Sequence, residues 1–82
     1  MDHEGRAILA KNLKGLRSLH AMTQEDLAGA AQIDRTYLSL VENKRYAATV
    51  DMLDKIAPVF DLRIDEMLQI DIVDIERVRR GK

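Results

Sequence analysis

The sequence predicts an all-α fold, in which five short helices form one compact domain. Apolar residues recur at helical spacing along most of the chain, and residues suited to begin a helix precede four of these stretches. Strand-like alternation is nearly absent before residue 70. The 82 residues are enough for one small domain and too few for two. Apolar residues make up 46% and charged residues 33% of the chain, a balance typical of globular proteins.

Two helices are expected before residue 32. The first begins after Asp2, a possible N-cap, and ends near His20. Its apolar face consists of Ile8, Leu9, Leu13 and Leu16. Thr23 can cap the second helix, because its hydroxyl oxygen can accept a hydrogen bond from a free backbone N–H of the first turn. Asp26 then stands where the positive end of the helix dipole stabilises an acid.

Three more helices are expected between residues 34 and 69. Asp34 can cap the third helix, whose expected buried residues are Leu38 and Val41. Thr49 can cap the fourth, whose expected buried residues are Val50, Leu53, Ile56 and Ala57. Pro58 should kink or end this helix, because proline lacks a backbone N–H and clashes with the preceding turn. A short fifth helix is expected around residues 64–68.

Residues 70–82 form a C-terminal extension after a domain of residues 1–69. The segment "QIDIVDI" alternates apolar and polar residues from Ile70, as a strand would. Ile72, Ile75 and Val78 also fit one face of a helix. Both interpretations stay open from the sequence.

The most informative stretch is "TQEDLAGAAQIDRTYLSLVE", from Thr23 to Glu42. A connection of about three residues prevents its two short helices from lying antiparallel, so they must cross at a steep angle. Ala28 and Ala31 are small enough to permit that close approach. This geometry is a helix-turn-helix at about residues 23–43. It turns the first half of the second helix outward, where a B-form major groove of about 12 Å can accept it.

This segment and its surroundings resemble the lambda-repressor-like (Cro-type, XRE) helix-turn-helix family, which includes phage repressors and restriction-modification controller proteins. The resemblance covers roughly Leu9 to Leu68 and is carried by "TQEDLA", "DRTYLS" and "VEN". It implies a five-helix lambda-repressor-like DNA-binding domain. Three positions depart from the family, which usually has glycine where this chain has Ala21, Gln32 and Lys44. A non-glycine residue in a left-handed conformation costs about 1 kcal/mol, so the fold should tolerate these departures.

The resemblance also implies roles in DNA binding. Arg35 is the expected main base reader, because its guanidinium can donate two hydrogen bonds to guanine O6 and N7. The expected base-reading residues are Arg35, Thr36, Ser39 and Leu40. Gln24 lies beside the free amides at the start of its helix, where similar regulators bind a phosphate. The expected phosphate contacts are Gln24, Tyr37, Asn43, Lys44, Arg45, Tyr46 and Thr49. The alternatives are a solvated charge for Arg35 and a solvated loop for "NKRY".

Two further expectations concern structure and assembly. In the family an arginine pairs with the glutamate that ends the recognition helix, and Arg17 and Glu42 occupy those positions. Specific binding usually needs a two-fold dimer on half-sites about 34–36 Å apart. The predicted homodimer surface consists of apolar residues in excess of what five short helices bury, namely Ile64, Met67, Leu68, Ile70, Ile72, Val73 and Ile75. The alternative is that these residues close the monomer core.

The expected function is a sequence-specific transcriptional regulator that binds double-stranded DNA at a palindromic operator. A different class of function is an antitoxin whose acidic segment Asp71–Glu76 binds a partner protein. A third is a helix-turn-helix used only for protein contacts. The net charge of −1 does not exclude DNA, because residues 1–48 carry seven Lys/Arg against six Asp/Glu, and phosphates respond to local charge.

Other functions find little support in the sequence. The chain has no cysteine, and His3 and His20 lack neighbouring ligands at metal-site spacing, so neither a metal nor a cofactor is expected. No histidine is placed to activate a serine, and no glycine-rich phosphate loop occurs, so no enzymatic activity is expected. No segment approaches the ~20 apolar residues of a membrane span, and the N-terminus lacks the layout of a secretory signal. A cytoplasmic location is expected.

Overall fold

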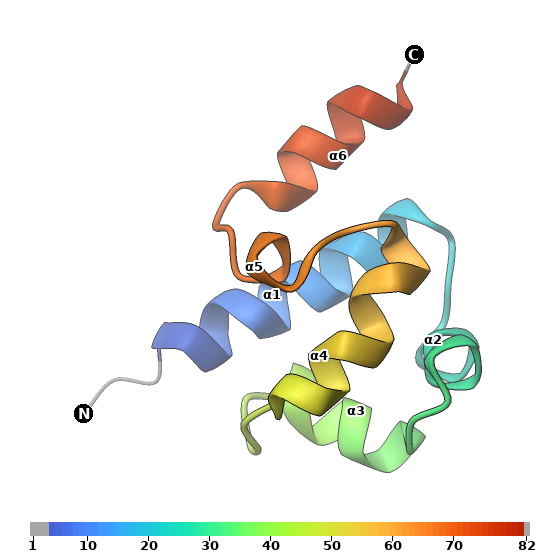
Figure 1. The fold of residues 1–82 in the computed structure, drawn as a ribbon, viewed down its shortest axis with the longest axis vertical. Helices are drawn as coiled ribbons and strands as arrows, with labels where there is room; N and C mark the ends of the chain where they lie inside the picture. The colour runs from blue at the N-terminus through green and yellow to red at the C-terminus, as the bar shows by residue number, and fades with distance from the viewer. Residues whose placement is uncertain (1–3, 82) are drawn as a thin grey trace.

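The computed structural model describes residues 4–81, and all regular secondary structure in this range is helical (Figure 1). Its elements are α1 (Glu4–Leu19), α2 (Gln24–Ala31), α3 (Arg35–Glu42), α4 (Val50–Ile56), the 3-10 helix η1 (Ala57–Phe60), α5 (Ile64–Met67) and α6 (Ile72–Arg80). The predicted all-α class is confirmed, and α1 to α5 correspond to the five expected helices. The expected cap Asp2, like His3, lies outside the described residues. No helix in the described range is long and apolar enough to cross a bilayer.

Side chains at the expected caps begin α2, α3 and α4. Thr23 Oγ1 accepts a hydrogen bond from Asp26 N at 3.0 Å, and Asp26 Oδ2 accepts one from Thr23 N at 2.9 Å. Asp34 Oδ1 accepts from Thr36 N at 2.7 Å at the start of α3. Thr49 Oγ1 accepts from Met52 N at 3.0 Å at the start of α4. Each bond satisfies a backbone donor that the helix itself leaves free, so the local sequence fixes where these helices begin.

Three α-helices end in residues with left-handed backbone, as does η1 at Asp61. Ala21 follows α1 with φ 56°, Gln32 follows α2 with φ 58°, and Lys44 follows α3 with φ 63°. These are the three positions at which the family usually has glycine. After α2 the chain turns sharply, and Ile33 N donates to Ala28 O at 2.9 Å. The chain therefore has left-handed backbone at these three positions although none of them is glycine, the residue that adopts this conformation at least cost.

The core lies where α1, α2 and α3 meet α4 and η1. Leu13, Leu16, Leu27, Leu38 and Ile56 are fully buried in it. One expectation for α4 is wrong, since Val50 is 66% exposed and Met52 takes the inward position. The buried stripe of α4 runs through residues 52, 53 and 56, and a residue in the first turn lies beyond the core. η1 follows α4 directly and contains Pro58, so the predicted interruption of the helix at this proline is confirmed.

The C-terminal extension forms a helix, α6, which packs along α1 at the end of the molecule opposite α3 (Figure 1). Gly15 makes this packing possible, because a Cβ at residue 15 would lie only 2.7 Å from Val73 Cγ2. Asn12 fixes the connection between α5 and α6, since its buried Nδ2 donates to Met67 O at 2.8 Å and Gln69 O at 2.9 Å. The strand interpretation of this segment is therefore wrong.

The predicted dimer surface needs a correction. Met67 and Ile72 are fully buried and Val73 is 9% exposed, because α5 and α6 fold back onto α1. These three residues belong to the monomer core and are unavailable to a partner. Ile64 and Ile75 are half-buried. Leu68 and Ile70 remain 45% and 63% exposed.

Candidate nucleic-acid interface

α3 shows two opposite faces. Leu38, Val41 and Glu42 anchor it in the core, whereas Arg35 and Thr36 are exposed at its N-terminal end. Ser39 and Leu40 are half-buried. Within residues 4–81, no carboxylate forms an ion pair with Arg35. Its guanidinium therefore keeps all its donors for a ligand.

A buried carboxylate connects the three helices around the turn. Arg17 Nε donates to Glu42 Oε2 at 2.7 Å and Nη2 donates to Glu42 Oε1 at 2.8 Å. Arg17 on α1 therefore pairs with Glu42 on α3, as expected from the sequence. Arg17 Nη1 also donates to Met22 O at 3.1 Å, just before α2. The hydrogen bond to Glu42 raises the pKa of Arg17 against the opposing effect of burial. This network sets the orientation of α3 against α1.

Gln24 joins the same network. Its Nε2 donates to Glu42 Oε1 at 3.0 Å. A side-chain amide nitrogen carries two hydrogens, so the other hydrogen of Gln24 stays available for an acceptor outside the protein. Glu42 thus fixes which end of the amide faces the core.

Two of the expected phosphate contacts, Tyr37 and Asn43, make hydrogen bonds within the chain. The Tyr37 hydroxyl donates to Ala47 O at 2.8 Å, and the ring of Tyr37 meets that of Tyr46 edge-on with centroids 6.1 Å apart. Asn43 Nδ2 donates to Ser39 O at 2.9 Å and so caps the end of α3. The single hydroxyl hydrogen of Tyr37 is therefore used in a hydrogen bond within the chain. Tyr37 therefore shapes the loop in this arrangement.

The remaining loop residues face solvent. Lys44, Arg45, Tyr46 and Thr49 are all exposed. The backbone N–H groups of Arg45 and Tyr46 both donate to Leu40 O, which folds the loop against the end of α3. Thr49 Oγ1 accepts from the backbone of α4 and keeps its hydroxyl hydrogen for another partner.

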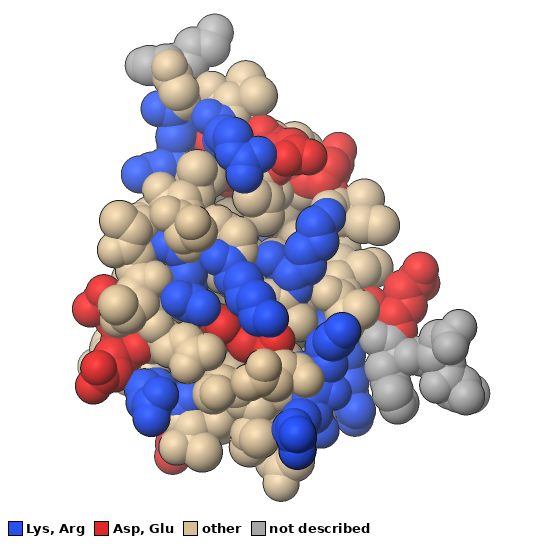
Figure 2. All heavy atoms as spheres, turned by 180° about the vertical axis from the view of Figure 1, so that it is seen from behind, with Lys and Arg blue, Asp and Glu red and all other residues tan. Residues whose placement is uncertain are grey.

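The distribution of charge explains how a chain with net charge −1 can present a positive surface. Figure 2 shows Lys and Arg side chains spread over one broad face, from the end that carries α6 to the end that carries α3. Acidic side chains on this face lie mainly towards its edges. Because phosphates respond to charges within about 8 Å in physiological salt, this local excess matters more than the total.

No cluster of three or more potential metal ligands occurs between residues 4 and 81. His20 packs against Phe60 with ring centroids 4.9 Å apart, and burial lowers its pKa.

A steeply turned pair of helices, α2 and α3, with the second exposed at its N-terminal end, defines a helix-turn-helix domain. Residues 13–67 match the helix-turn-helix family model. The chain therefore belongs to the XRE-type helix-turn-helix family of transcriptional regulators, as the sequence resemblance predicted.

Three curated relatives are similar to most of the chain. A hypothetical transcription factor of Neisseria meningitidis is 35% identical over 67 residues, which cover 82% of this chain and 63% of the relative. An HTH-type transcriptional regulator of Methanocaldococcus jannaschii is 32% identical over 59 residues, or 72% and 89% of the two chains. Control protein C.SmaI of Serratia marcescens is 30% identical over 63 residues, or 77% and 75%. The chain thus spans less than two thirds of the Neisseria relative's length.

A solved structure shares the fold. The clp gene regulator ClgR of Corynebacterium glutamicum superposes with a TM-score of 0.71 over 93% of this chain and 79% of that chain. Its sequence identity is 20%, so this likeness concerns architecture alone. The superposition extends well beyond residues 13–67 and confirms the helical arrangement of nearly the whole chain.

Proposed function

We propose that the protein binds DNA sequence-specifically and regulates transcription by occupying a palindromic operator as a homodimer. The observation that carries this proposal is the exposure of Arg35 and Thr36 at the N-terminal end of α3, while the rest of that helix is anchored in the core. A helix held in this way can enter the major groove without a change in the fold. The function needs no catalytic group, metal or cofactor, and it would place the protein with the DNA in the cytoplasm.

Arg35 is the proposed principal base reader. It lies in the first turn of α3, exposed and without a carboxylate partner among residues 4–81, so both arms of its guanidinium can address one guanine. Thr36 can touch a neighbouring base edge or a thymine methyl. Ser39 and Leu40 are half-buried and would contribute at the margin of the same surface.

The proposed phosphate contacts flank α3 on both sides. On one side Gln24 offers its second amide hydrogen, with the first held by Glu42. On the other side the loop offers Lys44, Arg45 and the hydroxyls of Tyr46 and Thr49. Contacts of this kind position a protein on the duplex and do not by themselves read the sequence.

The homodimer is proposed to form through the apolar surface that remains outside the core. Leu68 and Ile70, both in the connection from α5 to α6, are its exposed members. Ile64 and Ile75 are half-buried and would lie at its margin. A two-fold arrangement would present two copies of α3 to successive turns of the groove, about 34–36 Å apart.

Selection of bound duplexes from a random oligonucleotide pool tests this proposal. The wild-type chain should enrich an inverted repeat, and Arg35→Ala should relax the preference at one position in each half-site by about 1–3 kcal/mol. Arg77→Gln serves as the matched control, because it removes an exposed charge from α6 at the opposite end of the molecule. Failure to enrich any sequence, or equal preferences in Arg35→Ala and wild type, would refute the proposal.

The antitoxin alternative has less support. Its acidic segment lies at the start of α6, where Asp74 pairs with Arg77 at 2.9 Å and Glu76 pairs with Arg79 at 2.6 Å. Glu76 is also buried. These pairings reduce the negative charge that the segment could offer to a partner protein. Recovery of a tightly bound partner protein, without enrichment of DNA by the chain alone, would favour this alternative.

A further inference from the structure

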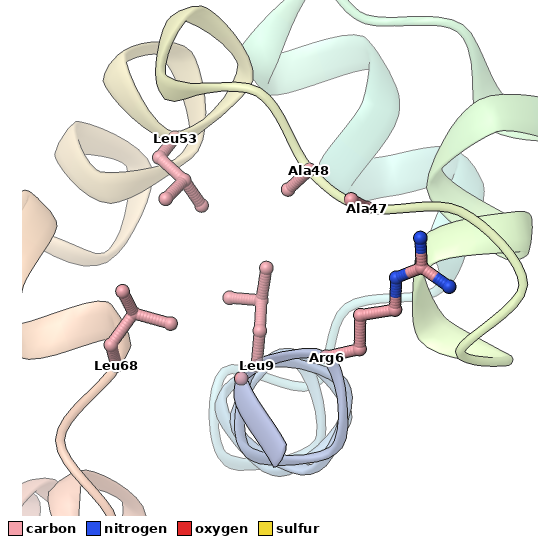
Figure 3. A pocket seen from close by; sticks show the side chains of 7 residues that line it. Arg6, Leu9, Ala47, Ala48, Leu53 and Leu68 are labelled. Carbon is pink, nitrogen blue, oxygen red and sulfur yellow. The ribbon is translucent and has the colours of Figure 1, made fainter. Parts of the chain in front are cut away.

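Arg6 is a cation of α1 to which the helix-turn-helix gives no role. It lies in the first turn of that helix and is half-buried. Its side chain borders a pocket of about 240 Å³, which is lined by Gly5, Arg6, Leu9, Ala47, Ala48, Leu53 and Leu68. Figure 3 shows that the guanidinium does not enter the apolar part of this pocket but reaches toward the loop that leads from α3 to Ala47. The aliphatic stem of Arg6 thus rests on apolar atoms while its charged end stays beside the loop.

The surroundings of Arg6 favour an anion. Within residues 4–81 no carboxylate forms an ion pair with this guanidinium. The neighbouring loop adds Lys44 and Arg45, both exposed, and no acid occurs between residues 43 and 50. α1 and the loop therefore bring cations from distant parts of the sequence to one side of the molecule. Their mutual repulsion would be relieved by a negatively charged ligand.

We propose that Arg6 binds a phosphate of the DNA backbone, so that α1 and the loop after α3 hold the same stretch of strand. This inference rests on the proposed function and adds a contact from outside the helix-turn-helix. A guanidinium can donate two parallel hydrogen bonds to one phosphate, which fixes geometry as well as charge. The contact contributes affinity and position and carries no sequence information.

The salt dependence of DNA binding tests the proposal. Binding of the full chain to its selected duplex is measured by fluorescence anisotropy across a series of salt concentrations. Arg6→Gln should weaken binding at least tenfold at low salt and reduce the slope of log K against log salt by about 1.8, because the homodimer loses one phosphate contact, worth about 0.9, in each half-site. Arg6→Lys should restore most of the slope, because it keeps the charge.

Lys11→Gln is the matched control. Lys11 is an exposed cation of the same helix, but its Nζ donates to Ile70 O at 3.4 Å, on the side of the connection to α6. Its removal changes the net charge equally and should leave the slope unchanged. An equal loss of slope in Arg6→Gln and Lys11→Gln would show that Arg6 acts only through the overall positive charge of the protein. That result would overturn the proposal.

Duplexes in which one DNA phosphate is replaced by an uncharged group allow a second, independent measurement. One methylphosphonate is placed at each backbone position in turn. At one position the substitution should weaken binding of the wild type, whereas Arg6→Gln should bind the modified and unmodified duplexes equally well. Absence of such a site would also overturn the inference. The proposed function is judged separately by Arg35→Ala, since that variant should change sequence preference while Arg6→Gln should weaken all sequences alike.

Discussion

Arg17 Nε lies 2.7 Å from Glu42 Oε2, and this ion pair joins α1 to the C-terminal end of α3. The Glu42 side chain is fully buried and that of Arg17 is 18% exposed. Glu42 also accepts from Gln24 at the start of α2, so one carboxylate serves three helices. The position of the recognition helix depends on this group.

Removal of one charge of the pair should destabilise the fold strongly. Glu42→Gln leaves the guanidinium of Arg17 largely buried without its counter-charge, which should lower the free energy of unfolding by about 3 kcal/mol. Arg17→Met should cost a similar amount for the converse reason. The double variant Arg17→Met with Glu42→Leu should cost less than the sum of the two, because no unpaired charge remains. Urea unfolding measures all three, and strict additivity would contradict this account.

Ala21→Gly should stabilise the protein. Ala21 has φ 56°, a conformation that costs an L-residue about 1–2 kcal/mol and glycine almost nothing. The greater freedom of glycine in the unfolded chain offsets part of this gain, so the net increase should be up to about 1 kcal/mol. Thermal unfolding should show a midpoint higher by a few degrees. A lower midpoint would show that the left-handed backbone at this site carries no strain.

Lys44→Gly should change stability and DNA affinity in opposite directions. Its φ of 63° gives the same reason for stabilisation as at Ala21. The variant also removes an exposed cation of the loop from each protomer, so DNA binding should weaken uniformly across sequences and the salt slope should fall by about two units per dimer. Ala21→Gly is the control, since it shares the backbone effect and removes no charge. Unchanged affinity in Lys44→Gly would remove Lys44 from the proposed phosphate contacts.

Two glycine-to-alanine changes should have opposite effects. At Gly15 a Cβ would meet Val73 Cγ2 at 2.7 Å and Cγ1 at 3.0 Å. Valine is β-branched and cannot turn aside easily, so Gly15→Ala should displace α6 and cost about 1–3 kcal/mol. At Gly29, in α2, no atom lies within 4 Å of the added Cβ, so alanine should stabilise the helix by about 0.5–1 kcal/mol. Thermal unfolding of both variants tests whether the close approach of α6 to α1 depends on Gly15.

The stability should decrease as the pH falls below about 6.5. Burial, and then the charge of Arg80, lower the pKa of His20, while Glu76 opposes them. The unfolded chain therefore binds a proton at this residue more readily than the folded chain does. The contribution of neutral His20 to the free energy of unfolding is fully present above the ordinary histidine pKa. It is lost as the pH falls from that value towards the lower pKa of His20 in the folded protein. Urea unfolding between pH 5 and 7.5 should show a weaker pH dependence in His20→Gln than in wild type.

Several features of the molecule were available from the sequence because they depend on neighbouring residues. Thr23, Asp34 and Thr49 begin helices through bonds to backbone groups two or three residues away. Among residues 4–81, three of the four non-glycine residues in left-handed conformation, Ala21, Gln32 and Lys44, stand where the family pattern expects glycine, and Asp61 is the fourth. The pairing of Arg17 with Glu42, 25 residues apart, is the exception, because it was implied by the family resemblance that "TQEDLA" and "DRTYLS" carry.

Only the tertiary structure decided which apolar and polar side chains remain accessible. The sequence assigned Met67, Ile72 and Val73 to a dimer surface, but they lie in the core because α6 turns back onto α1 at Gly15. It could not show that the hydroxyl of Tyr37 donates to Ala47 O within the chain. Burial and hydrogen-bond partners depend on contacts between segments far apart in the chain, which periodicity within one segment cannot specify. The sequence determined the helices and their turn, and long-range packing determined the surface they present.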